Sequence, residues 1–570
     1  MPSFVLPALP AATRLEVLQV DAAPIVRHFL DRLDLPGLFE RNLACLPGRQ
    51  PDVPSSTILC ALISNLLLCR EPLYAMSSWA ATFVPQHLGL LPGQAALLND
   101  DRCGRAADHL FRSDRASLFT AIVLGAINNY ELGLRQFHQD TTTVTFSGEY
   151  PDQVPATEKN RPARITRGYN KDHRPDLKQL IYDRTVTADG AVPIRCNILD
   201  GNTADDKVHQ RNWLALCELL GHSDFLYVAY SKLCSKDNLA LIADKKGRFL
   251  TVMPKTHKES KRFRAWVRHN DVPWVALVTR KNPRGKNKPD VSYHGYEDPQ
   301  GSEDGYRLFW YLSSQKKERD QQARTKHLNK TRKRLEQLRP RGRGGVFRSA
   351  EAAREAVERV LAKSKARKWL RVEIDEEEHM ETVQDGPGRP GPDTRYTTVT
   401  SYSYKIRVVI NKKALMRAAR CDGIFPLLSN DKSLGLKDAL EKYKYQPYAE
   451  KRHQQMKSVF GVMPVWLKNP KRVESLLWLY HLVDLVQALL EREVRRQMKK
   501  NGMESLPLYA EGRHSKAPTA ELVLKTFQGH RCYRLLDNND CEVLRFHDPV
   551  SEVAATLLSL LSIDRSAYGL

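Results

Sequence analysis

The stretch that decides the fold runs from Asp224 to Lys236 and reads DFLYVAYSKLCSK. Within it, the six residues from Phe225 to Tyr230 form an unbroken apolar run that ends abruptly in a polar loop. A short run of this kind predicts a central strand that is buried on both faces of a sheet. In an open α/β sheet, the chemistry takes place beyond the carboxyl ends of such strands. We therefore expect Tyr230 to stand where a functional side chain belongs.

The segments on either side of this run alternate between strand and helix patterns. From residue 134 to residue 146, LRQFHQDTTTVTF is rich in Thr, Val and Phe, and it predicts a strand with Asp140 on one face. An acidic side chain inside a strand is costly unless it has a partner or a function. The dipeptide Asp189-Gly190 predicts a hairpin between two further strands. Two helices and a strand are then expected at 205–220, 235–243 and 248–253.

The order of these elements is three antiparallel-type strands followed by strand, helix and strand, which matches a ribonuclease-H-like core in the α/β class. Composition alone does not select this fold over other α/β arrangements. The chain of 570 residues is too long for one hydrophobic core. We expect an N-terminal helical domain, the first part of the core, an inserted mixed β/α region, the last part of the core and a C-terminal helical region, at 1–125, 126–253, 254–420, 421–465 and 466–570.

Both ends of the chain carry apolar patterns of helical period. VLQVDAAPIVRHFLDRLDL, at 17–35, predicts helix from the start of the N-terminal domain. That domain either reads DNA ends or serves in packing or dimerisation. RVESLLWLYHLVDLVQALLEREVRRQM, at 472–498, predicts an amphipathic helix whose apolar side is wide enough to be buried. This helix either joins subunits or packs within its own chain.

The charge of the chain points to polyanions. Lys and Arg number 89 against 66 Asp and Glu, which gives a formal net charge of +23. A surface field of this sign attracts nucleic acid, although a merely basic protein is the alternative. The predicted helix at 316–339 carries ten Lys or Arg in 24 positions. That density suits phosphate contacts, and the alternative is a solvated helical arm.

Cysteine spacing and hydropathy indicate a soluble protein of the cytoplasm, associated with the nucleoid. The ten cysteines form no CxxC pair, so they predict reduced thiols and no disulfide frame or zinc site. The N-terminus lacks the pattern of a signal peptide. The most apolar early run, 58–69, is too short and too polar to span a membrane.

A second informative region is KYKYQPYAEKRHQQMKSVFGVMPV, from Lys442 to Val465. Pro447 fits the first turn of a helix. Glu450 and Lys457 lie seven residues apart, so they share one line at the rim of the buried face. Asp140 also points to that edge, and grouped carboxylates there can hold Mg²⁺ for phosphoryl transfer, the alternative being an ordinary surface helix. The apolar face of the helix is predicted to comprise Met456, Val459, Phe460 and Met463.

Six pieces, found in a fixed order between residues 137 and 458, carry a family resemblance: FHQDTTT, GYNKDHRPDLKQ, ADGAVPIRCNILDGNTADD, YVAYSKLCSKDNL, CDGIFPLLSND and YKYQPYAEKRHQQMKS. Together they resemble the insertion-sequence transposases of the DDE class, in the branch with a Y-x2-R-x3-E-x6-K signature around the final acid. The resemblance extends from about residue 98 to about residue 500. It implies a ribonuclease-H-like catalytic core, and a protein that binds terminal inverted repeats and target DNA as a homodimer.

The resemblance implies a catalytic set of Asp140, Tyr230 and Glu450. Asp140 and Glu450 match the first and last acids, which would hold two Mg²⁺ or Mn²⁺ ions. Tyr230 stands where the family has its second aspartate, since VAYSKL replaces VADSxL. A neutral phenol is a poor Mg²⁺ ligand, and its ring crowds the space that the ions need.

The resemblance also implies DNA-contacting residues. Tyr443 and Lys457 match the signature tyrosine and lysine, whereas Gln446 stands where the signature has arginine, so one phosphate contact is missing. Pro447 predicts a break in the helix, which places Tyr443 in the preceding turn. Further basic residues expected to contact DNA are Lys171, Arg174, Lys178, Arg332, Lys333 and Arg334.

Two functions follow as expectations. The first is an insertion-sequence transposase whose metal-dependent strand cleavage and transfer are impaired by Tyr230. The second is a catalytically inactive, transposase-derived DNA-binding protein that acts as a repressor or a dominant-negative partner. An RNA-binding protein on the same core is disfavoured by the spacing of Tyr443, Glu450 and Lys457.

Overall fold

The computed structural model describes residues 13–43, 51–150, 161–171, 174–282, 285, 288–339, 346–459 and 467–570. Two compact units are present. Unit 1 is built from the chain up to Phe249 and again from Lys442, and unit 2 is built from 250–441. The chain passes between the units within β6 (Arg248–Val252) and within α13 (Leu436–Tyr443).

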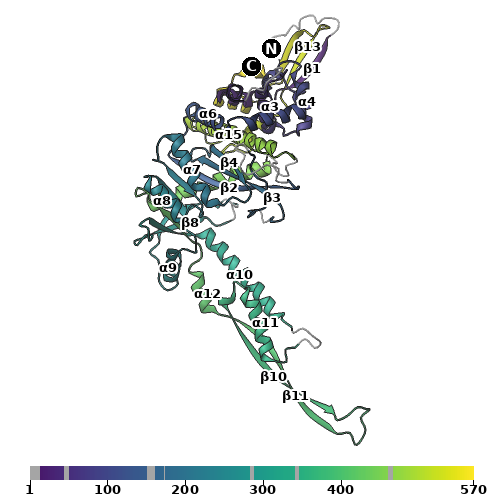
Figure 1. Ribbon diagram of the computed structural model, residues 1–570, viewed down its shortest axis with the longest axis vertical. Coiled ribbons are helices and arrows are strands. Elements are labelled where there is room, and N and C mark those ends of the chain that lie inside the picture. Colours follow the sequence, from purple (N-terminus) through teal and green to yellow (C-terminus); the bar gives the residue numbers. More distant parts are fainter. Residues whose placement is uncertain are drawn as a thin grey trace. The chain divides into compact units, whose positions relative to one another are not determined.

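The long helix α15 (Pro470–Lys500) is the centre of unit 1 (Figure 1). Its most apolar eighteen-residue window has a mean hydropathy of 1.4, long and apolar enough to cross a membrane, but 89% of that window is buried inside the unit. It packs against α3, α5 and β4, so packing within the chain accounts for its apolar side. The helices before the sheet are α1 (Ala23–Arg32), α2 (Leu35–Asn42), α3 (Ser55–Leu68), α4 (Met76–Ala81), α5 (Asp100–Arg112) and α6 (Arg115–Tyr130), with short 3₁₀ turns at Leu73–Ala75, Pro85–Leu88 and Gln94–Leu97.

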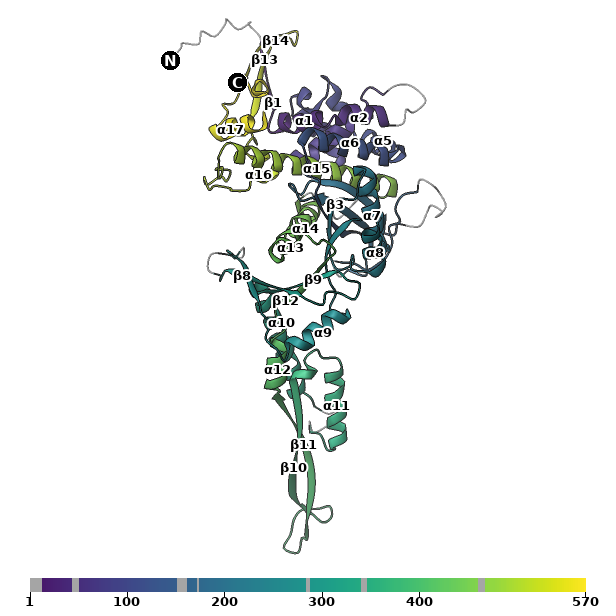
Figure 2. The ribbon, with the colours of Figure 1, turned by 90° about the vertical axis from the view of Figure 1, so that its left-hand side faces the viewer.

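The two ends of the chain meet in a three-stranded antiparallel sheet (Figure 2). β1 (Arg14–Gln19) pairs with β13 (Arg531–Leu536), which pairs with β14 (Glu542–His547). The prediction of helix from residue 17 was therefore wrong for 17–19. The prediction that the C-terminal region is helical was wrong for the two later strands, although α16 (Ala520–Lys525), α17 (Glu552–Leu561) and a 3₁₀ turn at Arg565–Tyr568 are present. A strand that pairs with a segment about 500 residues away leaves no local signal of helical or strand period.

The sheet of unit 1 has the order β4-β3-β2-β5. β2 (Gln136–Phe146), β3 (Lys178–Thr187) and β4 (Pro193–Asp200) are antiparallel neighbours, and β5 (Leu226–Ala229) runs parallel to β2. The α/β class is confirmed, as is the turn at Asp189-Gly190. The apolar run that opens at Phe225 forms β5, with one residue fewer at each end than predicted.

The predicted helices of this unit are confirmed. α7 spans Asp205–Leu220, and α8 spans Lys236–Asp244 with the Ser235 hydroxyl accepting a hydrogen bond from the Asn238 amide. α14 (Gln446–Gln454) has Pro447 in its first turn, as predicted, and it continues as a π-helical turn, Gln455–Val459. Met456 is buried as expected, whereas Phe460, Met463 and the Val459 side chain lie outside the described residues.

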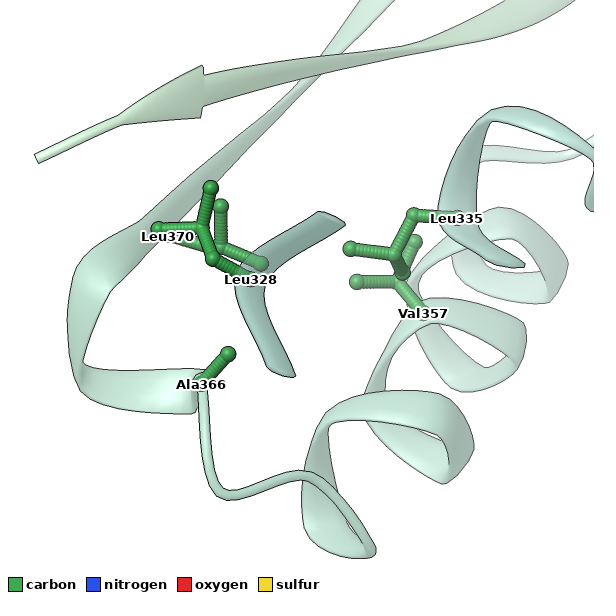
Figure 3. Close-up of a cluster of buried hydrophobic side chains, with 5 residues drawn as sticks. All are labelled: Leu328, Leu335, Val357, Ala366 and Leu370. Atoms are coloured by element: carbon green, nitrogen blue, oxygen red, sulfur yellow. The ribbon is translucent and has the colours of Figure 1, made fainter. Parts of the chain in front are cut away.

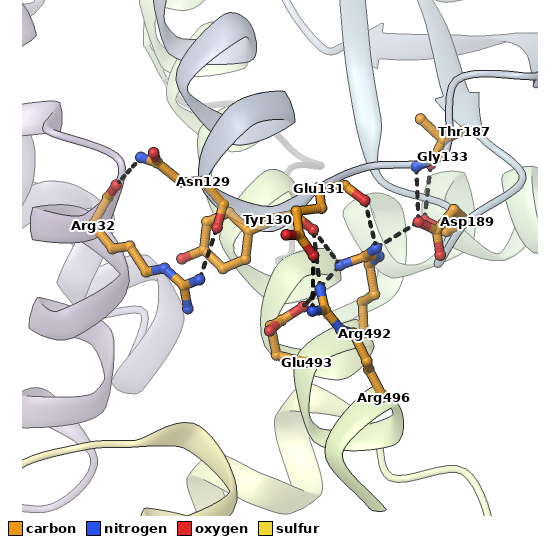
Figure 4. Close-up of polar contacts among 10 residues, drawn as sticks. All are labelled: Arg32, Asn129, Tyr130, Glu131, Gly133, Thr187, Asp189, Arg492, Glu493 and Arg496. Atoms are coloured by element: carbon orange, nitrogen blue, oxygen red, sulfur yellow. Dashed lines mark hydrogen bonds and ion pairs between the residues drawn. The ribbon is translucent and has the colours of Figure 1, made fainter. Parts of the chain in front are cut away.

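Polar contacts tie the β3–β4 turn to α15 (Figure 4). The Arg492 guanidinium donates to Asp189 Oδ2 at 2.6 Å and to the Tyr130 carbonyl at 2.8 Å. Asp189 Oδ2 also accepts from the Gly133 amide at 2.9 Å. Deeper in the unit, Arg184 on β3 and Asp484 on α15 form an ion pair of 2.8 Å with 1% and 0% of the two side chains exposed. Sheet and core helix are therefore joined through charge as well as apolar packing.

Unit 2 contains strands in the order β6-β12-β9-β8-β7, with antiparallel pairing along β6-β12-β9-β8-β7. Here β7 is Val275–Arg280, β8 is Val291–Asp298, β9 is Arg307–Ser313 and β12 is Ile424–Ser429. The helices are α9 (Lys258–Val267), α10 (Ser314–Glu336), α11 (Ala350–Ala362) and α12 (Lys412–Ala419), with a 3₁₀ turn at Arg367–Trp369. The predicted basic helix is thus α10.

A long hairpin of β10 (Leu370–Gln384) and β11 (Tyr396–Ile410) completes unit 2. Its base packs on α10 and α11 through a small buried cluster (Figure 3). The cluster consists of Leu328, Leu335, Val357, Ala366 and Leu370. The hairpin lies within the region at 254–420 that was predicted to be an inserted mixed β/α region.

Candidate active site and nucleic-acid interface

The parallel pairing of β2 with β5 places Asp140 beside Tyr230. The last paired residues of this ladder are Gln139 and Ala229. Asp140 and Tyr230 each follow by one residue, so they lie at the same level, with Tyr230 just beyond the carboxyl end of β5 and Asp140 inside β2, which continues to Phe146. This is the edge at which functional residues of α/β sheets gather. Tyr230, which the apolar run placed at a functional position, therefore lies beside Asp140.

Asp140 lies in a nearly buried position with one cation close by. Its side chain is 17% exposed, Lys171 Nζ lies 3.9 Å from Oδ1, and His453 Nε2 lies 3.8 Å from Oδ2. Burial raises the pKa of Asp140 to about 6, and the charge of Lys171 opposes this rise. Burial also holds the pKa of His453 well below its usual range, with further lowering by nearby Arg184. His453 is therefore neutral, and Lys171 is the cation that faces the carboxylate.

Glu450 and Tyr443 complete the surroundings. Glu450 is exposed on α14, and its negative charge contributes to the raised pKa of Asp140. Burial also raises the pKa of Glu450 itself. The Tyr230 ring meets the Tyr443 ring edge-on, with centroids 6.5 Å apart. Burial raises the pKa of Tyr443 to about 12, so the Tyr443 ring stays a neutral phenol.

These residues do not fit a two-ion Mg²⁺ site. The charge of one further carboxylate, Glu450, acts on Asp140, and a phenol occupies the place of a third oxygen anion. Among the described residues, no group of three or more Asp, Glu, His or Cys is arranged to hold a metal ion. Mg²⁺ prefers several oxygen ligands of which carboxylates supply the charge, and Tyr230 cannot supply one at neutral pH.

Gln446, at the position of the signature arginine, has a structural role. It is 0% exposed. His138 Nδ1 donates to Gln446 Oε1 at 2.7 Å, and Gln446 Nε2 donates to the Gln139 carbonyl at 2.9 Å. Burial lowers the pKa of His138 to about 4, so the imidazole is neutral and fits an amide partner. An arginine in this pocket would bring a buried charge next to His138, which explains why the chain has glutamine here.

The predicted DNA-contacting residues fall into separate places. Lys171 lies beside Asp140, and the charge of Lys457 contributes to the lowered pKa of His453, so both belong to the site. Tyr443 is the last residue of α13 rather than part of a turn.

The other predicted basic residues have different neighbours. Arg174 pairs with Asp176 at 2.7 Å, and Lys178 donates to the carbonyls of Glu149 and Tyr150. Arg332 pairs with Glu336 at 3.2 Å along α10 of unit 2. Lys333 and Arg334 are exposed on the same helix. Only a subset of the predicted contacts therefore surrounds Asp140.

Sequence reasoning missed His453 and a basic cavity. His453 follows Glu450 by three residues on α14, and that spacing was a usable signal. The cavity, of about 580 Å³, lies among the β3–β4 turn, α14 and α15. Its wall includes Tyr445 and Tyr448, whose rings lie 4.7 Å apart, with Lys451 and Lys499 exposed at its edge. Four arginines also line it: Arg452, Arg492, Arg495 and Arg496.

Comparison with known proteins adds three findings. A family model described as a domain of unknown function, DUF4277, matches residues 15–124. Among curated proteins, none matches the chain. Among solved structures, the chain is similar to the cryo-EM structure of a piggyBac transposase synaptic complex with hairpin DNA, at 9% sequence identity and a TM-score of 0.37, covering 91% of this chain and 82% of that chain. A TM-score of 0.37 is too low to assign a function, so the proposed function rests on the residues of the chain itself.

Proposed function

We propose that this protein is a DNA-binding protein of the DDE transposase type, with a ribonuclease-H-like core and with strand cleavage and transfer reduced or lost. The single observation that carries the proposal is the register of β2 and β5. It sets Asp140 and Tyr230 side by side where the parallel pairing of β2 and β5 ends, while the charge of Glu450 acts on Asp140. This supports the proposal of an acidic triad in which the middle carboxylate is replaced.

The DNA-binding part of the proposal is supported by charge. The chain has a formal net charge of +23, and basic side chains line the cavity beside α14. Lys451 and Lys499 are placed to contact phosphates, and Tyr448, whose exposed fraction is 53%, offers a ring on which a base can stack. The proposed ligand is double-stranded DNA, at the terminal inverted repeats of an element and at its target, bound by a cytoplasmic homodimer.

The catalytic part of the proposal concerns Mg²⁺ or Mn²⁺. When bound at an acidic triad, these ions supply the nucleophile and stabilise the charge that develops at the phosphorus atom. In this chain, Asp140 and Glu450 would hold such an ion weakly, because the phenol of Tyr230 adds bulk without charge. Lys171, 3.9 Å from Asp140, already neutralises part of the carboxylate charge. We therefore propose a repressor or a dominant-negative partner as the working role.

The test restores the missing acid. Tyr230→Asp is compared with wild type for Mg²⁺- or Mn²⁺-dependent cleavage of duplexes that carry the ends of the element. We expect cleavage only with Tyr230→Asp, together with an increase in melting temperature on adding Mg²⁺ that wild type lacks. Tyr230→Asn is the matched control, because it removes the ring without adding a charge.

The outcomes separate the two parts of the proposal. Cleavage by wild type at the level of Tyr230→Asp contradicts the loss of catalysis. Absence of salt-sensitive duplex binding by wild type contradicts the DNA-binding role itself. The double variant Asp140→Asn with Tyr230→Asp should lose the restored cleavage, since the first acid is then missing.

A further inference from the structure

The β10–β11 hairpin of unit 2 is much longer than the part of it that is packed. Its fifteen residue pairs run from Leu370 opposite Ile410 to Gln384 opposite Tyr396. At about 3.4 Å per residue, the hairpin is about 50 Å long. Within the described part of unit 2, only its base has neighbours, as both Figure 1 and Figure 2 show for α11 beside the start of the ribbon.

One face of the base is covered by helices. Ile374 and Ile406, which are opposite each other, pack with Phe347, and Val372 and Val408 pack with the cluster on α10 and α11. Tyr404 also donates its backbone N–H to the Phe347 carbonyl at 2.9 Å, which adds one rung of pairing at the edge of β11. The covered face is thus the one that carries the even-numbered residues of both strands.

The same face continues without a cover beyond Tyr404. It presents Tyr402, Met380 and Tyr396, with exposed fractions of 45%, 68% and 54%. The paired residues between them are mostly threonines. We call residues 377–403 the distal arm. In the described part of the chain, the backbone hydrogen bonds of the distal arm join its two strands and its loop only to each other.

A two-stranded ribbon of this kind needs a partner. An isolated hairpin is marginally stable in water, and packing against a helix or a third strand is what usually secures it. The base of this hairpin has such packing and the distal arm does not. Bare strand edges also present a row of unpaired backbone groups to any neighbouring chain. Because the even-numbered apolar face continues beyond the part that α10 and α11 cover, we expect another protein surface to pack against it.

The charge of the hairpin identifies the occupant. Residues 370–410 carry eight Asp or Glu and five Lys or Arg, a formal charge of −3, so the remainder of the chain carries +26. The ion pairs described within the hairpin lie at its base, from Arg371 to Glu377 with Lys405 and Arg407. The distal arm therefore keeps an acidic surface, which DNA repels and a basic protein surface attracts.

We propose that the distal arm is a docking element that lies against the basic surface of a second copy of this chain. Tyr402, Met380 and Tyr396 supply the apolar contact, and Glu378, on the same face, supplies charge that selects the partner. Pairing of two arms with each other is disfavoured, because it would bring like charges together. This role goes beyond DNA binding and does not depend on it, since the distal arm contains none of the residues proposed to contact DNA.

The experiment measures self-association by sedimentation velocity in the full-length protein without DNA. In the deletion variant, residues 378–402 are replaced by Asn-Gly, which forms a tight turn and leaves the packed base intact. In the point variant, Tyr402, Met380 and Tyr396 are all changed to Ser. We expect a dimer in wild type, a monomer in the deletion variant, and a dissociation constant raised by about tenfold or more in the point variant.

A matched control lies on the opposite face of the same arm. Val383 and Val399, exposed by 47% and 49%, belong to the odd-numbered face, which no helix covers at the base. Their double change to Ser removes apolar surface from the other face of the same arm and should leave the dissociation constant unchanged within about twofold. Raising salt from about 0.1 M to about 1 M should weaken wild-type association.

A photo-crosslinker at position 380 decides which chain the arm touches. Two differently tagged copies are mixed, and the expected product joins the tags through residues outside the hairpin. A monomeric wild type at micromolar concentrations overturns the proposal, as does a dimer that survives deletion of the arm. A crosslink confined to one chain, or one that joins two arms, also overturns it. Duplex binding by the deletion variant is measured as well. If this variant still binds duplex DNA, its loss of self-association is independent of the proposed DNA-binding role.

Discussion

The two faces of the β4-β3-β2-β5 sheet each carry a buried carboxylate, and the two carboxylates differ in the hydrogen bonds that they accept. Asp183 on β3 is 0% exposed and faces α7. Its Oδ1 accepts from Gln139 at 2.5 Å, and its Oδ2 accepts from Asn197 at 2.8 Å and from Asn212 at 2.6 Å. Burial raises the pKa of Asp183, and the three amide donors oppose that rise. Both carboxylate oxygens of Asp183 therefore accept hydrogen bonds from side-chain amides.

Asp140, on the other face, is much less completely satisfied. The hydrogen bond described for its carboxylate comes from the Thr141 amide at 2.8 Å, while Lys171 stands at 3.9 Å. The pKa of Asp140 rises to about 6, with burial as the first cause. The Asp183 carboxylate thus stabilises the fold, whereas the ionised Asp140 carboxylate lowers its stability. A cost of that kind is expected at a functional position.

The largest expected effect comes from Asp183→Ala. Removal of the carboxylate leaves the amide groups of Gln139, Asn197 and Asn212 without their acceptor inside the protein, so we expect the free energy of unfolding to fall by about 4 kcal/mol. Urea denaturation at pH 7.5 measures it. A loss below about 1 kcal/mol would show that the amides find other partners and that the comparison of the two faces does not hold.

The second effect has the opposite sign. Asp140→Asn removes a charge whose folded-state pKa is about 6, above its ordinary value of 3.8. The folded state therefore binds the proton more tightly than the unfolded state, and ionisation destabilises the fold as pH rises through this window. We expect Asp140→Asn to increase the free energy of unfolding by about 3 kcal/mol at pH 7.5.

The pH dependence provides the control for this second prediction. Below about pH 3, the Asp140 carboxyl is neutral in both states, so the gain from Asp140→Asn should vanish there. The measurement is a series of urea denaturation curves for wild type and variant between about pH 3 and about pH 8. A gain that is constant across the series would mean that packing, and not ionisation, is responsible.

The smallest effect concerns Lys171. Its charge lowers the pKa of Asp140, so Lys171→Gln should move the pH at which the Asp140→Asn gain develops upward by less than about one unit. The comparison needs the double variant, because the coupling between the two positions is the quantity of interest. An unchanged midpoint would show that water already screens this pair.

The sequence by itself determined the elements and the principal positions. Local periodicity located β2, β5, α7 and α8, because alternation and apolar runs follow directly from the geometry of strands and helices. Asp140 and Tyr230 were singled out for the same reason. Pro447 was correctly read as a break, since proline removes a backbone donor.

Only the tertiary structure decided which residues meet. β1 depends on β13 for its hydrogen bonds, Lys171 reaches Asp140 from a loop 31 residues further along the chain, and Gln446 is buried where it contacts His138. The exposed face of the distal arm likewise becomes visible only once α10 and α11 are seen to end before it. Local sequence encodes backbone conformation, whereas contacts between distant segments depend on the packing of the whole chain.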